Sequence, residues 1–354
     1  MLARMNIGSF DLNNPFFVAP MAGVTDQPFR SLCKKLGAAY AVSEMISARP
    51  DLRHTAKTAR RASHEGEPGP IAVQIAGTDS AMMADAARFN MDCGAQIIDI
   101  NMGCPAKKVC NRWAGSALMR DEPLALAIIE AVVAACEPRG VPVTLKMRAG
   151  WSQSHKNALA LSRKAELAGV QMIVVHGRTR EQGYRGEAEY DTVAEIKAAL
   201  RIAVVANGDI DTPQKARQVL QRTGVDAVMI GRSAQGRPWI FREMAHYMAT
   251  GQVLAPPLVA EVRQLLLAHL HDHYSLYGEV LGVRTARKHI RWYLHPLPGS
   301  KDFLDAMNLI ADCAHQTDAV ASFLDELGQG MDRLPSPVAP PAAGQVKPIW
   351  EVTT

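Results

Sequence analysis

The chain has 354 residues and a formal net charge of +4, with 48% hydrophobic and 21% charged residues, a composition typical of globular proteins. No apolar run reaches the roughly 18 residues that a membrane-spanning helix needs, and Met1–Asn6 lacks the apolar core of a signal peptide. The six cysteines are scattered without a Cys-x-x-Cys pair, which argues against a zinc or iron–sulfur centre and for a reducing compartment. We therefore expect a cytoplasmic protein with no metal and no membrane attachment.

The first part of the chain alternates short apolar segments with helical ones. Phe16–Gly23 is expected to be a strand that runs into a Pro/Gly turn, helical spacing follows over Pro28–Leu32, and Ala41–Met45 is a second strand. The segment Arg49–Arg61 carries five basic residues against one acid, and they would share one face of a helix. This stripe is either a solvated helix face or a surface for an anionic partner.

The same alternation continues to residue 231. The expected strands are Ile71–Ile75, Ile97–Asn101, Val143–Lys146, Met172–His176, Ala203–Asn207 and Ala227–Gly231. The expected helices are Ser80–Cys93, Pro123–Cys136, Ala158–Ala168, Tyr190–Leu200 and Pro213–Arg222. Eight short strands that mostly alternate with amphipathic helices predict an α/β fold of the (β/α)8 TIM-barrel type. An open doubly wound sheet is the alternative, but no Gly-x-Gly-x-x-Gly follows the first strand.

Polar side chains stand at or beside the C-terminal ends of most of these strands. Barrel enzymes carry their active sites at that end, and buried polar groups are costly unless paired, so the pattern predicts a ligand site. The strand ends carry Pro20, Met21, Ala22, Glu44, Gln74, Asn101, Lys146, His176, Asn207, Gly208, Asp209, Gly231 and Arg232.

The loops after the seventh and eighth strands are the usual phosphate-binding loops of such barrels. They read Asn207-Gly208-Asp209 and Gly231-Arg232-Ser233. Glycines let backbone N–H groups approach an anion, a following helix N-terminus favours negative charge, and Arg232 adds a fixed positive charge. A tight glycine turn is the alternative for either loop alone.

Lys146 ends the fifth strand in a crowded part of the barrel, where an ammonium group needs an anionic partner. A flavin supplies one, because negative charge develops near N1 and O2 of its ring on reduction. Gln74 has both a donor and an acceptor, which suits the N3–H and O4 edge of the same ring. The main alternative is a Schiff-base lysine in a non-redox phosphate-sugar lyase.

Cys104 lies between Gly103 and Pro105 just after the fourth strand. Glycine is permissive and proline rigid in φ, so the strand should end here and hold the thiol on a turn at the barrel mouth. A buried packing cysteine is the alternative. The lysines at 107 and 108 favour the chemical interpretation.

Several motifs together resemble the tRNA-dihydrouridine synthase family, and most closely its bacterial B-type branch. They are Val18–Asp26, Ser43–Met45, Val73–Gly77, Asn101–Val109, His176–Thr179, Asn207–Ile210 and Ile230–Arg232. The resemblance covers about residues 6 to 328. It implies an oxidoreductase that uses FMN and NADPH to reduce a specific D-loop uridine of tRNA to 5,6-dihydrouridine. By the same resemblance, hydride passes from FMN N5 to C6 of uracil, and Cys104 protonates C5.

The resemblance also implies roles for individual residues. FMN would be held by Pro20, Met21, Ala22, Gln74, Lys146, His176, Asn207, Gly208, Asp209, Gly231 and Arg232. Asn101 is expected to hydrogen-bond the base, and Lys107 and Arg178 to face the tRNA backbone. A thiol with a pKa near about 8.5 stays largely protonated at neutral pH, which suits Cys104 as the acid.

Residues 1–245 are expected to form the FMN-binding barrel, and residues 256–328 an all-helical tRNA-binding domain. In that domain Arg284, Arg287, Lys288 and Arg291 recur at helical spacing on one face, which suits contacts with phosphates. The adjacent Trp292 and Tyr293 either contact RNA or pack in the core. Residues 331–354 are rich in proline and alanine and are expected to be a disordered tail.

We expect a monomer that binds the D-loop and elbow of tRNA. A flavin barrel acting on a free pyrimidine is an alternative that gives no use to the basic helical domain. A tRNA-binding or folding factor whose catalysis is incidental is another, and it predicts that Cys104→Ala does everything the wild type does. The sequence leaves open which uridine is reduced and whether NADPH or NADH is preferred.

Overall fold

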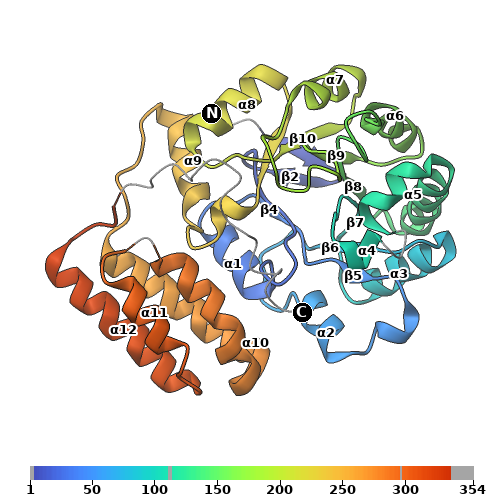
Figure 1. The fold of residues 1–354 in the computed structure, drawn as a ribbon. Helices are drawn as coiled ribbons and strands as arrows, with labels where there is room; N and C mark the ends of the chain where they lie inside the picture. Colours follow the sequence, from blue (N-terminus) through green and yellow to red (C-terminus); the bar gives the residue numbers. More distant parts are fainter. Residues whose placement is uncertain (1–3, 111–113, 296, 336–354) are drawn as a thin grey trace.

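The computed structural model describes residues 4–110, 114–295 and 297–335. Nine parallel strands form one sheet in the order β4-β3-β11-β10-β9-β8-β7-β6-β5. They are β3 (Phe16–Val18), β4 (Tyr40–Ala41), β5 (Ile46–Ser47), β6 (Ala72–Ala76), β7 (Ile97–Met102), β8 (Val143–Arg148), β9 (Met172–His176), β10 (Ala203–Asn207) and β11 (Ala227–Ile230). Val42, which follows β4, bridges Ala72 of β6 and so closes the sheet. β4 and β5 are two parts of one interrupted strand, and the predicted (β/α)8 barrel is confirmed (Figure 1).

Helices fill the connections and surround the strands (Figure 1). They are α1 (Gln27–Lys35), α2 (Ala56–Ala62), α3 (Ser80–Asp92), α4 (Lys107–Cys110), α5 (Glu122–Cys136), α6 (Ala158–Leu167), α7 (Asp191–Ala199), α8 (Pro213–Thr223) and α9 (Ile240–Thr250). Short 3-10 turns are η1 (Pro50–Leu52), η2 (Gly115–Arg120), η3 (Glu137–Arg139) and η4 (Arg232–Ala234). Several helices begin where a side-chain oxygen accepts a hydrogen bond from the backbone N–H three residues later, as at Asp26, Asp79, Asp121 and Thr212.

The alternation of side chains along the strands separates two cores. Ile98 and Ile100 of β7 pack in the cluster between the sheet and the helices, whereas Ile97 belongs to a second cluster inside the barrel. An antiparallel hairpin, β1 (Met5–Ile7) with β2 (Phe10–Leu12), adds Ile7 and Leu12 to that second cluster. Asp99 and Asn101 share the face of Ile97 and therefore lie on the inner side of β7.

A helical region follows α9 and lies beside α1 (Figure 1). It contains α10 (Val259–Leu294), α11 (Ser300–Met307) and α12 (Cys313–Gly330). α10 is interrupted at Gly278, whose φ of 73° and ψ of 179° suit only glycine. Nε2 of His273 lies 2.8 Å from Oγ1 of Thr285, twelve residues later, whereas a continuous helix would separate those positions by about 18 Å. α10 is therefore a helical hairpin with a first limb before Gly278 and a second limb after it.

The basic segment differs from its prediction. Arg49–Arg61 is not one helix but η1 followed by the short α2. Three of its arginines have acidic partners, because Arg49 pairs with Asp51, Arg53 with Asp85 and Arg61 with Glu44. The segment is therefore less available to an anionic partner than its sequence suggested. Glu44 also accepts a 2.6 Å hydrogen bond from the Gly23 backbone, so the predicted strand Ala41–Met45 is broken at residues 43–45.

Two boundaries also differ from prediction. The barrel extends past residue 245, because α9 reaches Thr250 and its Met248 packs against the barrel cluster. The predicted start of the disordered tail at residue 331 is also too early, because residue 332 is still part of the fold. Val259 donates a 2.9 Å backbone hydrogen bond to the carbonyl of Asp332. The rest of that tail, residues 336–354, lies outside the described residues. In the described part, no helix is long and apolar enough to cross a membrane.

Candidate functional site

The strand ends bring most of the predicted polar residues together. Asn101 of β7 pairs in register with Lys146 of β8, and His176 of β9 pairs with Asn207 of β10. Because all strands of the barrel are parallel, these side chains stand at its C-terminal end. The polar residues at the ends of β6 to β10 therefore form one candidate site.

A chain of hydrogen bonds fixes two amides in this site. Nδ2 of Asn101 donates to Oε1 of Gln74 at 2.6 Å, and Nε2 of Gln74 donates to Asp99 at 2.6 Å. The second oxygen of Asp99 accepts from Oγ1 of Thr144 at 2.6 Å. Burial raises the pKa of Asp99 to about 6, although these hydrogen bonds oppose the shift. Asp99 thus sets which way the Gln74 amide points.

The turn that carries Cys104 is held from both sides. Oδ1 of Asn101 accepts from the backbone N–H groups of Gly103 and Cys104, at 3.2 and 3.0 Å. Oγ of Ser116 donates to the Cys104 carbonyl at 2.9 Å. Burial raises the pKa of the Cys104 thiol, so the thiol keeps its proton at neutral pH. This geometry suits proton donation from a fixed position.

Lys146 is a buried cation, and the negative charge of the nearby Asp99 opposes the lowering of its pKa by burial. Its Nζ donates to Oδ1 of Asn207 at 3.0 Å, and no ion pair joins it to an acid within the described residues. Burial and the nearby Arg148 lower the pKa of Lys146 to about 8. Burial and the surrounding cations also hold the pKa of His176 well below its usual range, so His176 is neutral at pH 7. The site therefore offers a positive charge beside neutral hydrogen-bonding groups.

The loop after β10 is built around a buried ion pair. Asp209 has a φ of 49° and accepts two hydrogen bonds from Arg178, at 2.8 and 2.6 Å. The backbone N–H of Ala188 donates to the same carboxylate at 2.8 Å, and the half-exposed Arg232 approaches it to 3.3 Å. Because Arg178 neutralises Asp209, the positive charge of Arg232 remains available to an anionic ligand.

The expectation that Arg178 faces the tRNA backbone is not met. Its side chain is 0% exposed. Besides Asp209, its guanidinium donates to the carbonyls of Arg185 and Gly186. Arg178 is therefore a structural residue of the loops at the site, and its donors are already used.

The loops after β3, β10 and β11 approach one another closely. Met21 donates its backbone N–H to Oγ1 of Thr25 at 2.8 Å, which shapes the turn that contains Pro20 and Ala22. Gly208 has a φ of 121°, and a Cβ there would lie 2.8 Å from the His176 ring. Gly208 is therefore required for His176 to sit against this loop. Gly231 faces Met21, since a Cβ at Gly231 would lie 3.7 Å from the Met21 sulfur.

The basic residues of α10 do not share one surface. Arg284 is exposed, whereas Arg287 donates to the carbonyl of Ile310 at 3.0 Å. Lys288 points to the barrel, where its Nζ would lie 3.6 Å from a Cβ on Gly23. Tyr293 is 1% exposed and belongs to the core of the helical region.

Two further predicted contacts are settled only in part. Trp292 is partly buried against the barrel core, so the structure places it in packing. Lys107 begins α4, but its side chain lies outside the described residues.

Three residues of the site were not predicted. Asp99 and Thr144 orient Gln74, and Arg148 donates to the carbonyls of Gly103, Thr179 and Gly183. Arg148 thereby joins the Cys104 turn to the loop after β9. The sequence did contain a signal for Asp99 and Arg148, because a charged residue inside an otherwise apolar strand is costly unless it is paired.

Comparisons with known proteins agree on one family. A family model described as dihydrouridine synthase (Dus) matches residues 17–327. A tRNA-dihydrouridine synthase B of Xanthomonas campestris is 56% identical over 327 residues, which cover 92% of this chain and 98% of that protein. A protein of the same name from Pseudomonas putida is 54% identical over 331 residues, covering 94% of this chain and 97% of that protein.

Solved structures support the fold alone. An amine oxidase from Pseudomonas geniculata that acts on 6-hydroxypseudooxynicotine aligns with a TM-score of 0.55 and 14% identity. The alignment covers 74% of this chain and 52% of that chain. At this identity, the match supports the barrel architecture and says nothing of the substrate.

Proposed function

Because the chain belongs to the dihydrouridine synthase family, we propose that it reduces a specific uridine of tRNA to 5,6-dihydrouridine with bound FMN. The observation that carries the proposal is the placement of Cys104. Its protonated thiol is fixed on a turn beside Asn101, at the same barrel end as the buried cation of Lys146. A redox barrel that reduces a double bond needs both a proton donor and a charge that stabilises a flavin.

The donor set fits FMN. Lys146 makes no ion pair with an acid within the described residues, which suits the ring edge that becomes negative on reduction. Gln74, held by Asp99, and the neutral His176 offer hydrogen bonds to the rest of the ring. Gly208, Gly231 and Arg232 would hold the phosphate, with Pro20, Met21, Ala22 and Asn207 completing the wall. Asp209 acts through Arg178 and Arg232 rather than on the phosphate itself.

The chain's own residues account for the second half of the reaction. When bound, FMN supplies the hydride that adds to C6 of the uracil ring, and NADPH is the proposed source of its electrons. Cys104 then gives its proton to C5. Oδ1 of Asn101 already accepts hydrogen bonds from the backbone N–H groups of Gly103 and Cys104, so this oxygen is not available to the base. We therefore assign Asn101 to positioning Cys104, with any contact to the base made through Nδ2.

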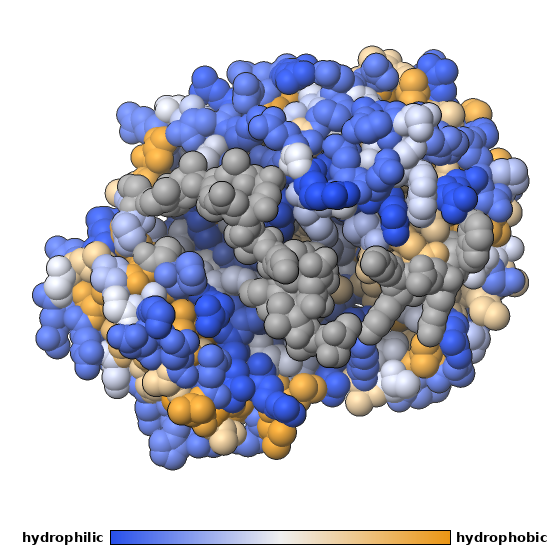
Figure 2. All heavy atoms as spheres, viewed as in Figure 1, coloured by the Kyte–Doolittle hydropathy of each residue, from blue (hydrophilic) through white to orange (hydrophobic). Residues whose placement is uncertain are grey.

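The helical region supplies the proposed RNA surface. Arg284, in residues 256–328, is exposed, and Figure 2 shows hydrophilic and hydrophobic patches mixed over this region. A uridine in the D-loop must leave its stack to reach the barrel mouth, which costs a few kcal/mol. Phosphate contacts by basic residues outside the site offset that cost. We propose that the protein works as a monomer on the D-loop and elbow of tRNA.

An anaerobic absorbance experiment tests this function. The purified protein should show flavin bands that bleach with NADPH and return only after unmodified tRNA is added. Cys104→Ala should keep the flavin and its reduction, but slow the tRNA-dependent return by about 100-fold or more. Cys93→Ala, which changes an exposed thiol at the C-terminal end of α3, is the control and should behave like wild type. A colourless protein that FMN cannot reconstitute, or full activity in Cys104→Ala, would contradict the proposal.

A further inference from the structure

A buried cluster of one carboxylate and three imidazoles lies where the barrel meets the helical region. Asp26 precedes α1, His269 and His273 stand on the first limb of α10, and His289 stands on its second limb. None of the four residues is more than 2% exposed. They belong to three separate segments of the chain, and the proposed reaction uses none of them.

Six polar atoms of this cluster have no hydrogen-bond partner. They are Oδ2 of Asp26, Nδ1 of His273 and both ring nitrogens of His269 and of His289. Buried polar groups are normally paired with protein or with a bound ligand, because an unpaired one loses its hydration without compensation. Such a concentration in one place indicates a missing partner.

The orientation of His273 shows what kind of partner is missing. Oγ1 of Thr285 donates to the Leu281 carbonyl at 2.7 Å, so it must accept from Nε2 of His273, which lies 2.8 Å away. Nε2 therefore carries the ring proton in the neutral imidazole, and Nδ1 presents a lone pair. That nitrogen faces Oδ2 of Asp26 at 3.4 Å. In that tautomer two acceptors face each other, and a cation, either a metal ion or a second ring proton, would lie between them.

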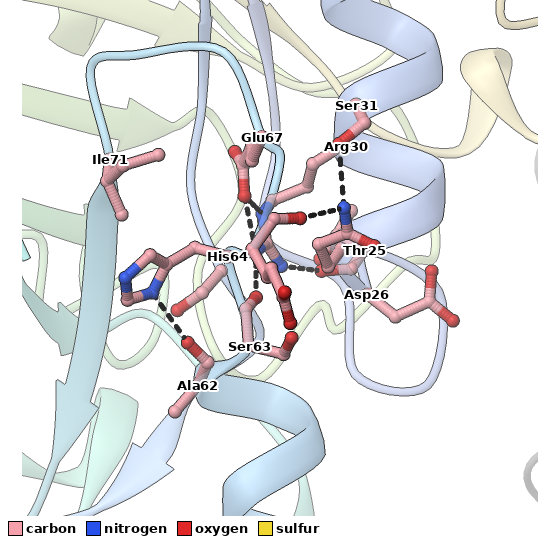
Figure 3. A network of polar contacts seen from close by, with 12 residues as sticks. Thr25, Asp26, Arg30, Ser31, Ala62, Ser63, His64, Glu67 and Ile71 are labelled. Atoms are coloured by element: carbon pink, nitrogen blue, oxygen red, sulfur yellow. Dashed lines mark hydrogen bonds and ion pairs between the residues drawn. The ribbon is translucent and has the colours of Figure 1, made fainter. Parts of the chain in front are cut away.

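The surrounding charges do not supply that cation. Figure 3 shows that Arg30 is occupied by Glu67 and by the carbonyls of Thr25 and Ser63, while the Asp26 side chain points away from it. Lys288 lies near enough to Asp26 for the carboxylate to affect its pKa, but makes no hydrogen bond or ion pair with it within the described residues. Tyr277 stacks its ring 4.4 Å from His273 and has a side-chain hydrogen bond with Asp26, but it brings no charge.

We propose that Asp26, His273 and His289 bind a divalent transition-metal ion of the zinc class, with His269 or a water molecule as fourth ligand. Ligand atoms of the first three residues lie within 4.8 Å of one another. Donor atoms around a tetrahedral zinc ion are about 3.4 Å apart, so small side-chain rotations bring them to one ion. The hydrogen bond from His273 to Thr285 is the outer contact that metal-bound histidines usually make.

The ion would join the barrel to the helical region. Asp26 caps α1 through its other oxygen, which accepts from the backbone N–H of Phe29 at 3.1 Å. One bound ion would therefore tie the start of α1 to both limbs of the α10 hairpin. The cysteine spacing that argued against a metal centre does not apply here, because this donor set contains no cysteine and is scattered along the sequence.

Metal analysis of the full-length protein tests this site. Protein stripped with EDTA, then dialysed with zinc chloride and passed through a desalting column, should retain about one equivalent of zinc by elemental analysis. Titration with zinc chloride should also raise the unfolding temperature, as binding to the native state alone requires. Asp26→Asn keeps an acceptor for the α1 cap and removes only the charge, and His289→Gln removes one ligand. Each should weaken zinc binding at least tenfold.

His271→Gln is the matched control, because His271 lies on the same limb of α10 but is exposed. It should bind zinc like wild type. Retention of FMN by each variant reports that it is folded and keeps this test separate from that of the proposed reaction. Wild-type protein that retains no zinc would overturn the proposal and leave water as the partner of these atoms. Equal zinc binding by wild type, Asp26→Asn and His289→Gln would overturn it too.

Discussion

Asp99 accepts a 2.6 Å hydrogen bond from Gln74, and this contact fixes a predicted flavin ligand from inside the barrel. Asp99→Leu has a similar shape but no acceptor, so the Gln74 amide loses its orientation. We expect FMN to bind about tenfold more weakly, since a hydrogen bond to a charged group contributes roughly 1.5 kcal/mol or more. Fluorescence quenching of FMN during titration measures this.

Asp99→Asn is the conservative control for that experiment. Its amide oxygen can accept from Gln74 while its NH2 group donates to Thr144, whose hydroxyl can turn to accept. We expect FMN affinity within a few-fold of wild type. Wild-type affinity in Asp99→Leu would show that Gln74 is positioned by something other than Asp99.

Lys146 should destabilise the flavin-free protein at neutral pH. Its pKa is about 8 in the fold and about 10.4 in an unfolded chain. Between these values the unfolded chain binds more protons, so stability rises with pH across this window and is lowest below pH 8. Lys146→Met should therefore stabilise the flavin-free protein at pH 7 by up to about 3 kcal/mol, with no gain near pH 10.

Urea unfolding of flavin-free wild type and Lys146→Met at pH 7 and pH 10 measures this difference. The same variant should bind FMN poorly at both pH values, because it lacks the cation beside the ring. A destabilised Lys146→Met at pH 7 would mean that the ammonium has an anionic partner that offsets its burial.

The barrel and the residues at its strand ends were predictable because both depend on local pattern. Apolar strands of four to six residues, such as the one ending at Asn101, are recognisable one at a time, and parallel strands bring their ends together without further information. The family resemblance rests on the same local motifs, and the comparisons confirm it. Lys146 and Asn207, 61 residues apart, meet for this reason alone.

The parts that were missed depend on partners distant in sequence. The sequence suggested that Arg178 is a surface cation. Only the fold shows that it forms an ion pair with Asp209, which is 31 residues away in the sequence. Gly278 stands inside a continuous helical pattern, and its positive φ turns the helix back on itself as a hairpin. The Asp26 cluster follows from that same turn, since only the hairpin brings His289 beside His273.

The pair of Arg178 and Asp209 should contribute strongly to stability. Arg178→Met leaves a carboxylate that is only 28% exposed without its main partner. Removing one member of a buried ion pair costs about 3 kcal/mol or more, so urea unfolding should show a loss of this order. FMN should also bind more weakly, because the freed charge of Asp209 repels a phosphate.

Arg222→Met is the control, because the ion pair of Arg222 with Asp191 is exposed on both sides. Such surface pairs contribute less than about 1 kcal/mol, so this variant should keep nearly all of its stability. An equal loss of unfolding free energy in both variants would mean that the buried ion pair of Arg178 stabilises the protein no more than the exposed pair of Arg222.

Arg284 is the residue of α10 best placed to test the RNA surface, because it is exposed whereas Arg287 and Lys288 already have partners or lie against the barrel. Arg284→Gln removes one charge without disturbing packing. If Arg284 contacts a phosphate, tRNA affinity should fall several-fold at low salt, and the dependence of log affinity on log salt should become shallower by about 1.

Filter binding of unmodified tRNA at several salt concentrations measures both quantities. Arg222→Gln, on α8 of the barrel, carries the same change of net charge and should leave the salt dependence unaltered. Parallel salt curves for wild type and Arg284→Gln would exclude Arg284 from the contact and move the RNA surface to the residues around α4. In the proposed reaction NADPH reduces the bound flavin without tRNA, so the rate of this step should be the same in all three proteins. A change in affinity can then be assigned to the RNA surface alone.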